Sequence, residues 1–332
     1  MTLLTYNLNN DGPSFQVAAG QRTSVVYVSD FLESLLDAEQ QRALVRDITD
    51  STIGQMPDEV GRLAHYYGGK CMGYPAVWLL KHALEIEDQK LIEVAASCKA
   101  SIFLSLTTSI VDDWLDKDTE VSVAPVSLMY MLMVGGLGDL KSENFPAECA
   151  LQKLREVTEH LLSVERCASL AHREKLQACK ELASDAGIKI GHFHELIATE
   201  FCNANTVRSS KADALGNIAN KFGCWCAFLD DVIDLRSDFE AGNWVSVPAL
   251  DLAFALRSDC GDSGFSLAGT EKFESLSSDC QARMIDRAGL KLGDLGAEAI
   301  ELGLVNLGAE LLRVEENLPD YLDDFLASAG QS

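Results

Sequence analysis

Two short strings of aspartates are the residues in this chain whose types and spacing could do chemistry. Both have the form D-D-x-x-D, and their members are Asp112, Asp113 and Asp116 in the first string and Asp230, Asp231, Asp234 and the trailing Asp238 in the second. On a helix, the i, i+4, i+8 spacing of the second string would stack three carboxylates on one stripe, where like charges repel. A chain that does this twice is expected to meet a counter-charge at both places. Because Mg²⁺ prefers oxygen ligands and commonly binds a few carboxylates together with substrate phosphates, the strings predict a magnesium site.

The segments that precede the strings are long and apolar, and they determine where the aspartates would lie. Residues 91–116 and 212–234 are each predicted to form a helix that is apolar through most of its circumference and therefore central in a bundle. Their acidic ends would then face each other at the mouth of a deep apolar cavity. Mg²⁺ between the carboxylates would clamp a diphosphate, and the cavity would hold a hydrocarbon chain. An allylic prenyl diphosphate has both parts, and the expected reaction is loss of diphosphate to leave a carbocation in a dry pocket.

The rest of the chain also shows helical periodicity, and strand-like alternation is hard to find. Further helices are predicted over residues 76–84, 126–137, 145–172, 174–186, 188–202, 247–256, 282–293, 297–313 and 321–325. No boundary is apparent within residues 24–326, so we predict one large all-α helical bundle with a central apolar cavity. Residues 1–23 are expected to form an N-terminal arm, and residues 327–332 a C-terminal tail.

Composition narrows the classes of partner. The chain has 332 residues, of which 47% are hydrophobic, and a formal net charge of −24. Such a charge argues against nucleic acid and against anionic membrane surfaces, because both need a basic face on the protein. The uncharged run over residues 121–138 is long enough to be checked as a membrane span, but its proline and glycines and its acidic flanks favour a buried helix. We therefore expect no integral membrane segment.

Two other groups of potential metal ligands give no metal site. Ten cysteines are scattered through the chain, and the closest pair, Cys224 and Cys226, lacks the second half of a zinc site. We interpret them as reduced cysteines of an intracellular, cytoplasmic protein. His192 and His194 precede Glu195, but residues i and i+2 do not share a helix face. These three are interpreted as polar residues of the core or the surface.

The aspartate strings and their surroundings resemble the trans-isoprenyl diphosphate synthase (polyprenyl synthetase) family, which shares the class I terpene synthase fold. The resemblance covers roughly residues 60–250, and the segments that carry it are Gly68-Gly69-Lys70, residues 109–118, Leu137-Gly138-Asp139, and residues 228–242. It implies an all-α bundle of the isoprenoid synthase type, a requirement for Mg²⁺, a prenyl diphosphate substrate and commonly a homodimer.

The departures from the family concern the second substrate, isopentenyl diphosphate. Positions where the family carries cationic or polar contacts to that diphosphate read differently here, namely Cys71, Gly73, residues 118–122, Ala198-Thr199, Cys226-Ala227 and Gly242-Asn243. Each charge-assisted hydrogen bond contributes roughly 1.5–3 kcal/mol, so losing several should weaken the second substrate's binding considerably. The pattern favours a terpene synthase that ionises one prenyl diphosphate of the farnesyl or geranylgeranyl class. A prenyltransferase with an altered acceptor site and a non-catalytic subunit of a heteromeric prenyl synthase are the alternatives.

Further residues are candidates for direct contact with the substrate. They are Lys70 and Arg236 for the diphosphate, Thr108 for the chain length, and Phe103, Trp225 and Phe228 for a carbocation. A solvated side chain is the alternative interpretation for the two basic residues, and core packing is the alternative for the three aromatic residues. In the family, bulky residues one turn before the first string shorten the product, so the small threonine implies room for a farnesyl chain or longer.

Overall fold

A computed structural model describes residues 73–87, 90–115, 143–168, 170–242, 244–260 and 270–329. Every regular element in these ranges is helical, which confirms the predicted all-α class. In chain order the elements are α4 (Gly73–Leu84), α5 (Leu91–Ser97), α6 (Lys99–Leu115), α8 (Ala147–Ala168), α9 (His172–Leu182), the short 3₁₀ helix η2 (Ala183–Asp185), α10 (Ile188–Ala204), α11 (Ser209–Ile233), α12 (Leu235–Ala241), α13 (Val247–Cys260), α14 (Glu271–Glu301) and α15 (Val305–Ala329). The predicted N-terminal arm, Lys70, Asp116 and the apolar run over residues 121–138 lie outside the described residues.

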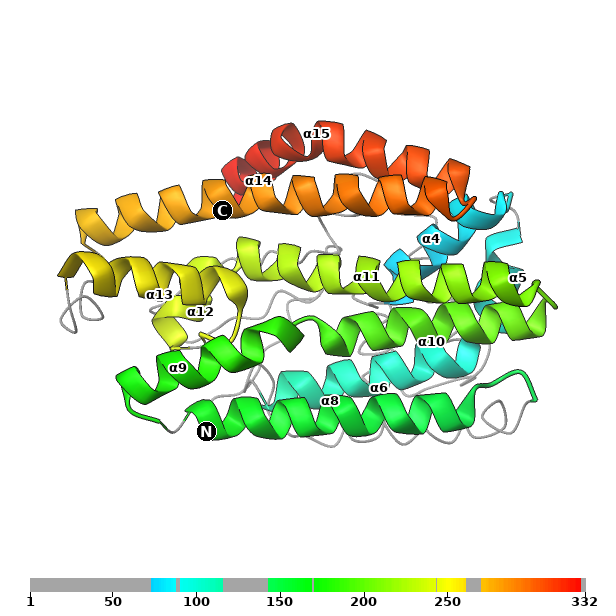
Figure 1. The fold of residues 1–332 in the computed structure, drawn as a ribbon, viewed down its shortest axis with the longest axis horizontal. Helices are drawn as coiled ribbons and strands as arrows, with labels where there is room; N and C mark the ends of the chain where they lie inside the picture. The colour runs from blue at the N-terminus through cyan, green and yellow to red at the C-terminus, as the bar shows by residue number, and fades with distance from the viewer. Residues whose placement is uncertain are drawn as a thin grey trace, which may run out of the picture.

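The helices are arranged as an elongated bundle whose long members run roughly parallel to one axis (Figure 1). Helices α10 and α11 form its centre and pack against each other, α14 lies against α11 and carries α15, and α6 and α8 lie against α10. The shorter α9, α12 and α13 gather at the end of the bundle where α11 finishes. None of the described helices is long and apolar enough to cross a membrane.

The central helices approach closely because glycines face one another. A β-carbon added at Gly223 would lie 2.7 Å from the carbonyl oxygen of Ile190 and 2.8 Å from the α-carbon of Gly191. Both glycines are buried. Small residues at a helix crossing let two backbones approach, and this contact holds the C-terminal part of α11 against the first turn of α10. The position of the second aspartate string, at the end of α11, therefore depends on this contact.

Aromatic rings fill the interior beside the two central helices. Trp78 of α4, Phe222 and Trp225 of α11 form a row, with ring centroids 5.5 Å and 5.6 Å apart. The indole nitrogen of Trp225 donates a hydrogen bond of 2.9 Å to the carbonyl oxygen of Ala288, so α14 is tied to the same row. These contacts join α4, α11 and α14.

The second long helix forms as predicted, and the first is divided. Residues 209–233 form α11, whereas residues 91–115 are split at Cys98 into α5 and α6. The buried carboxylate of Glu200, on α10, accepts a hydrogen bond of 2.8 Å from the backbone N–H of Ser101, in the first turn of α6. A side chain from another helix thus satisfies an amide that a new helix start leaves without an intrahelical partner.

Predicted breaks near the C-terminus are wrong. The sequence pattern separated residues 282–293 from 297–313, but α14 continues to Glu301, and the turn comes at Gly303, whose φ is +81°. Gly296 stays helical because it faces Gly308 of α15: a β-carbon there would lie 3.1 Å from the Gly308 carbonyl oxygen. In this case glycine marks a helix contact and not a helix end.

Candidate functional site

The second aspartate string lies where α11 passes into α12. Asp230 and Asp231 occupy the last turn of α11, and Asp238 lies in α12. The helix is interrupted at Asp234, yet the i→i−4 backbone bonds continue, from the Asp234 N–H to Asp230 and from the Asp238 N–H to Asp234, each 2.9 Å. The spacing expected of a single helical stripe is thus largely kept across the interruption.

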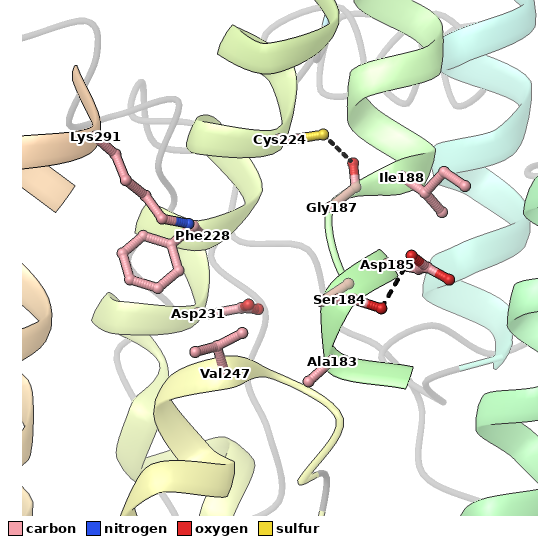
Figure 2. A pocket seen from close by; sticks show the side chains of 11 residues that line it. Ala183, Ser184, Asp185, Gly187, Ile188, Cys224, Phe228, Asp231, Val247 and Lys291 are labelled. Carbon is pink, nitrogen blue, oxygen red and sulfur yellow. Dashed lines mark hydrogen bonds between the residues drawn. The ribbon is translucent and has the colours of Figure 1, made fainter. Parts of the chain in front are cut away.

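Asp231 borders a cavity of about 170 Å³. Figure 2 shows its carboxylate directed into the gap between α11 and the segment that joins α9 to α10. Cys224 and Phe228 from α11, residues 183–188, Val247 from α13 and Lys291 from α14 complete the walls. The cavity is small and mostly apolar, with charged groups at its edge. The large central apolar cavity expected from the sequence remains a prediction.

Burial and electrostatic repulsion act together on Asp231. Desolvation of its carboxyl group, followed by the nearby charges of Asp238, Asp230 and Asp234, raises the pKa of Asp231 well above its usual range. The positive charge of Lys291 acts in the opposite direction but does not outweigh them. A carboxylate in this position is stabilised when a cation neutralises part of the string.

The donor set suits a hard divalent cation, although it does not form a complete metal site. Carboxylate oxygens are the ligands that Mg²⁺ prefers, and Asp230, Asp231, Asp234 and Asp238 supply several of them. Among the residues described, no three His, Cys, Asp or Glu side chains converge on one point where an ion could bind. Mg²⁺ usually takes only one or two protein carboxylates and completes its shell with phosphate oxygens and water. The string therefore fits a metal that is shared with other ligands.

The first aspartate string is described only in part. Asp112 and Asp113 belong to the last turn of α6, and their side chains lie outside the described residues, as does all of Asp116. The expected position of the two strings opposite each other stays a prediction. Thr108 lies one turn earlier on α6 and is half-buried. Its hydroxyl group donates a hydrogen bond of 2.9 Å to the carbonyl oxygen of Leu104 in its own helix.

The three aromatic candidates occupy different environments. Phe103 and Trp225 are buried, with exposed fractions of 2% and 3%, and belong to the main apolar core. Phe228 is equally buried but forms part of the cavity wall. The ammonium group of Lys291 lies 4.2 Å from the centroid of its ring, so one face of Phe228 already contacts a cation.

Arg236 is engaged by carboxylates on the outside of the bundle. Its guanidinium group donates two hydrogen bonds to Glu274, of 2.9 Å and 2.5 Å, and a third of 3.3 Å to Glu240. The side chain is 55% exposed. Arg236 is not among the residues that line the cavity at Asp231, so the arrangement matches the alternative of an exposed, paired arginine.

Lys291 is the residue at this site that sequence reasoning missed. It lies 60 residues beyond Asp231 in the sequence, in a helix pattern that carries no recognisable motif. Only the packing of α14 on α11 brings it to the cavity. Arg287, one turn earlier on α14, also lies over the Phe228 ring, with its guanidinium carbon 5.8 Å from the centroid. No spacing rule in the sequence could have linked these two residues to the aspartates.

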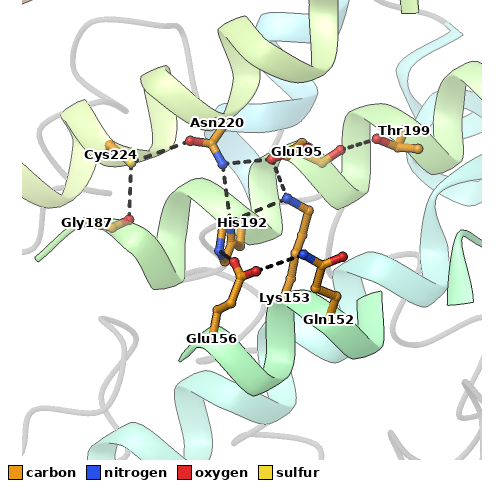
Figure 3. Close-up of polar contacts among 9 residues, drawn as sticks. All are labelled: Gln152, Lys153, Glu156, Gly187, His192, Glu195, Thr199, Asn220 and Cys224. Carbon is orange, nitrogen blue, oxygen red and sulfur yellow. Dashed lines mark hydrogen bonds and ion pairs between the residues drawn. The ribbon is translucent and has the colours of Figure 1, made fainter. Parts of the chain in front are cut away.

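A second polar cluster lies between α8, α10 and α11 (Figure 3). Lys153 contacts Glu195 at 2.5 Å, Asn220 donates to the same carboxylate at 2.8 Å, and the Nε2 atom of His192 lies 2.8 Å from Glu156. Burial and the charge of Lys153 lower the pKa of His192, more than the contact with Glu156 raises it. These residues satisfy one another across three helices, so His192 and Glu195 have the structural contacts expected of polar residues of the core or the surface.

Comparison with known proteins identifies the fold. Neither a family model nor a curated protein matches the chain. Solved structures do match: geranylgeranyl pyrophosphate synthase from Lactobacillus brevis, with a TM-score of 0.54 and 14% identity, covers 87% of this chain and 98% of its own. Polyprenyl synthase from Caulobacter crescentus, complexed with calcium and isoprenyl diphosphate, has a TM-score of 0.53 and 17% identity, and the match covers 90% of this chain and 98% of that one. Heptaprenyl diphosphate synthase from Staphylococcus aureus has a TM-score of 0.51 and 14% identity, and the match covers 89% of this chain and 98% of that one.

These matches extend over almost the whole length of each synthase. The chain therefore has the trans-isoprenyl diphosphate synthase fold, as the motifs in the sequence predicted. At identities of 14–17% the likeness defines the fold, and the activity has to be argued from the site.

Proposed function

We propose that this protein is a class I terpene synthase, which ionises one allylic prenyl diphosphate of the farnesyl or geranylgeranyl class and releases diphosphate. One residue, Asp231, carries the observation on which the proposal depends. It belongs to a string of carboxylates that repel one another at the end of a central helix, beside a mostly apolar cavity, in a fold shared with prenyl diphosphate synthases. Such a string is suited to bind a cation that in turn binds a diphosphate.

The residues of the chain would have separate roles in binding the metal, the diphosphate and the hydrocarbon chain. Asp230, Asp231, Asp234 and Asp238 would hold Mg²⁺ on one side, and Asp112, Asp113 and Asp116 would hold it on the other. Bound Mg²⁺ would supply the charge that stabilises the departing diphosphate oxygen. The apolar side chains near the string would keep water from the allylic group. Lys70 would add a contact to the diphosphate.

A prenyltransferase is the second candidate, and two observations favour it. The solved structures that match the chain are a geranylgeranyl pyrophosphate synthase, a polyprenyl synthase and a heptaprenyl diphosphate synthase. In addition, Lys291 and Arg287 lie over Phe228, close to the string, and they supply positive charge although other residues replace the basic residues that the family uses. An allylic diphosphate would then condense with isopentenyl diphosphate or with another acceptor. A non-catalytic subunit is a third possibility, and a pull-down that recovers an obligate catalytic partner would support it.

Product analysis distinguishes the candidates. We would incubate the protein with geranyl, farnesyl or geranylgeranyl diphosphate, each with Mg²⁺ or with EDTA, and with or without labelled isopentenyl diphosphate. The terpene synthase predicts hydrocarbon or alcohol products with Mg²⁺ alone. Incorporation of label into a longer diphosphate would instead identify a prenyltransferase. If none of the three substrates reacts under either condition, the proposed function is wrong.

The proposal includes a homodimer that acts in the cytoplasm. Light scattering coupled to size-exclusion chromatography measures the molar mass in solution directly. A mass of about one chain, 36.1 kDa, at assay concentration would contradict the dimer without affecting the proposed chemistry.

A further inference from the structure

Two cations stand next to each other on α14, and the charge of one of them, Lys291, acts on the carboxyl group of Asp231. Arg287 and Lys291 are one helical turn apart, and both lie over the ring of Phe228, at 5.8 Å and 4.2 Å from its centroid. Neither has an acidic group within ion-pairing distance in the part of the chain that the structure describes. Other basic residues of the same helix are paired: Lys272 with Asp259, and Arg283 with Asp251.

This arrangement is unusual for the composition of the chain. Acidic residues number 51 against 27 lysines and arginines, so a basic side chain has many potential partners. Instead, Arg287 and Lys291 repel each other. Burial, followed by the charge of Arg287, lowers the pKa of Lys291. An aromatic face stabilises a cation, but it does not neutralise the charge. Arg287 and Lys291 together could therefore bind an anion.

Lys291 also stands where two hollows meet. It borders the cavity that contains Asp231, and it borders a second hollow of about 280 Å³ between α11 and α14, lined in part by Lys221, Trp225 and Glu298. Figure 2 shows its side chain extending from α14 across Phe228 toward α11. An anion in contact with the ammonium group could therefore reach the end of the carboxylate string from this side.

We propose that Arg287 and Lys291 bind a diphosphate group at the end of the carboxylate string. The inference deepens the proposed function, on which it rests for the identity of the anion. The aspartates alone would repel a diphosphate, so cations on the facing helix make this end of the molecule able to hold one. The diphosphate could be the leaving group of the ionised substrate or part of a second, phosphorylated substrate. Both sources present the same chemistry to α14.

Binding of inorganic pyrophosphate tests the site without any turnover. Isothermal titration calorimetry in EDTA and in Mg²⁺ would compare the wild-type protein with Lys291→Met and Arg287→Gln. Because a lost charge-assisted contact corresponds to roughly tenfold or more in affinity, each variant should raise the dissociation constant about tenfold in both buffers. Lys272→Met, on the same helix but paired with Asp259, should leave it within twofold. Circular dichroism and melting temperature would establish that all variants are folded.

Two outcomes would overturn the proposal. One is wild-type protein that binds no pyrophosphate in either buffer. The other is an equal effect of Lys272→Met and Lys291→Met, which would mean that only overall charge matters and that the pair belongs to a solvated helix face.

The source of the diphosphate follows from kinetics of the same variants. A raised KM for the allylic substrate assigns the site to the leaving group. A raised KM for isopentenyl diphosphate alone assigns it to a second substrate. Failure of the proposed function remains distinguishable, because a protein that turns over no prenyl diphosphate can still be titrated with pyrophosphate. Conversely, Asp230→Asn should abolish turnover and should not weaken the binding of pyrophosphate measured in EDTA, because it removes a negative charge beside the site.

Discussion

At the scale of single residues, the aspartates of the second string have the same side chain but different surroundings, and only Asp231 lines the cavity described above. Asp231 borders the cavity, and its charge is opposed by desolvation and by three neighbouring carboxylates. In the metal-free protein such a group costs stability when it is ionised, since both effects disfavour the charged form. Sites built for binding commonly carry this kind of cost.

Neutralising Asp231 should therefore stabilise the metal-free protein. We expect Asp231→Asn to raise the melting temperature in EDTA by roughly 2 °C, because an increase of about 1 kcal/mol in the free energy of unfolding produces a shift of this size in a chain of this length. Turnover with Mg²⁺ should fall at least tenfold. Differential scanning fluorimetry and diphosphate release measure the two effects. Asp213→Asn, an exposed position on the same helix, should change neither, and a lower melting temperature for Asp231→Asn would contradict the repulsion argument.

His192 shows that the protonation state of a residue can follow from its neighbours. Its Nδ1 atom lies 3.5 Å from the ammonium group of Lys153 and 3.3 Å from the amide nitrogen of Asn220, and both of these groups are donors. Nδ1 must then accept, so the proton is on Nε2, which donates to Glu156. A neutral imidazole agrees with the lowered pKa of His192, which burial and Lys153 cause.

The contribution of His192 to the stability of the protein should accordingly fall as pH decreases toward 5.5. Because the pKa of His192 is lowered in the folded state, the unfolded chain takes up the proton first, and stability is lost below the ordinary histidine pKa of about 6.5. One such group gives at most about 1.4 kcal/mol per pH unit. Urea unfolding between pH 5.5 and 7.5 would measure this slope, and His192→Gln should reduce it. The comparison with wild type is needed since burial also lowers the pKa of His160. An unchanged slope would mean that folding does not lower the pKa of His192.

At the scale of helices, the contact between α10 and α11 decides where the second aspartate string lies. Gly223→Ala would place a methyl group 2.7 Å from a carbonyl oxygen of α10, and the two helices would have to separate. Overpacking of this kind costs roughly 1–3 kcal/mol, so we expect a melting temperature several degrees lower and reduced turnover.

Gly289→Ala on α14 is the matched control, because a β-carbon there meets nothing within 4 Å. It should stabilise the protein by roughly 0.5–1 kcal/mol through helix propensity alone. Thermal unfolding of both variants tests the pair. Equal effects of the two substitutions would mean that α10 and α11 do not approach as closely as described.

Helices were predictable where apolar periodicity is long, and their ends were predictable only where local chemistry decides them. The pattern that predicts residues 212–234 agrees with α11 to within a few residues. The start of α6 was missed because it depends on Glu200, which lies about 100 residues away in the sequence. The predicted break between residues 293 and 297 contains Gly296, and glycine favours both a helix contact and a helix end, which sequence alone does not separate. Tertiary contacts resolved both cases.

At the scale of the whole molecule, the fold was predictable from motifs, whereas the site was predictable only in part. Aspartate strings repeat at recognisable spacing, so they indicated the isoprenoid synthase fold although identity to the solved synthases is 14–17%. The cations of α14 follow no spacing and become visible only when α14 packs on α11. Counting basic residues by motif therefore underestimated the positive charge at the string. That difference bears directly on the choice between one substrate and two.

The large negative charge of the chain also predicts how ligands should change its stability. With a formal charge of −24, any salt should stabilise the fold somewhat by screening self-repulsion. Mg²⁺ together with pyrophosphate should do more, because binding to the folded state alone adds about 2.7 kcal/mol when the ligand is at 100 times its dissociation constant. We expect a higher melting temperature in Mg²⁺ and pyrophosphate than in NaCl of equal ionic strength.

Asp230→Asn separates these two contributions. The variant should keep the increase that NaCl produces, since screening acts on the whole surface, and should lose most of the additional increase from Mg²⁺ with pyrophosphate. Lys291→Met should also lose part of the additional increase in melting temperature. Lys272→Met should retain the increase, because Lys272 pairs with Asp259 and neither residue lines the cavity at Asp231. If NaCl at equal ionic strength gave wild type the full increase, no specific site would exist, and the cluster of aspartates would be only one more part of an acidic surface.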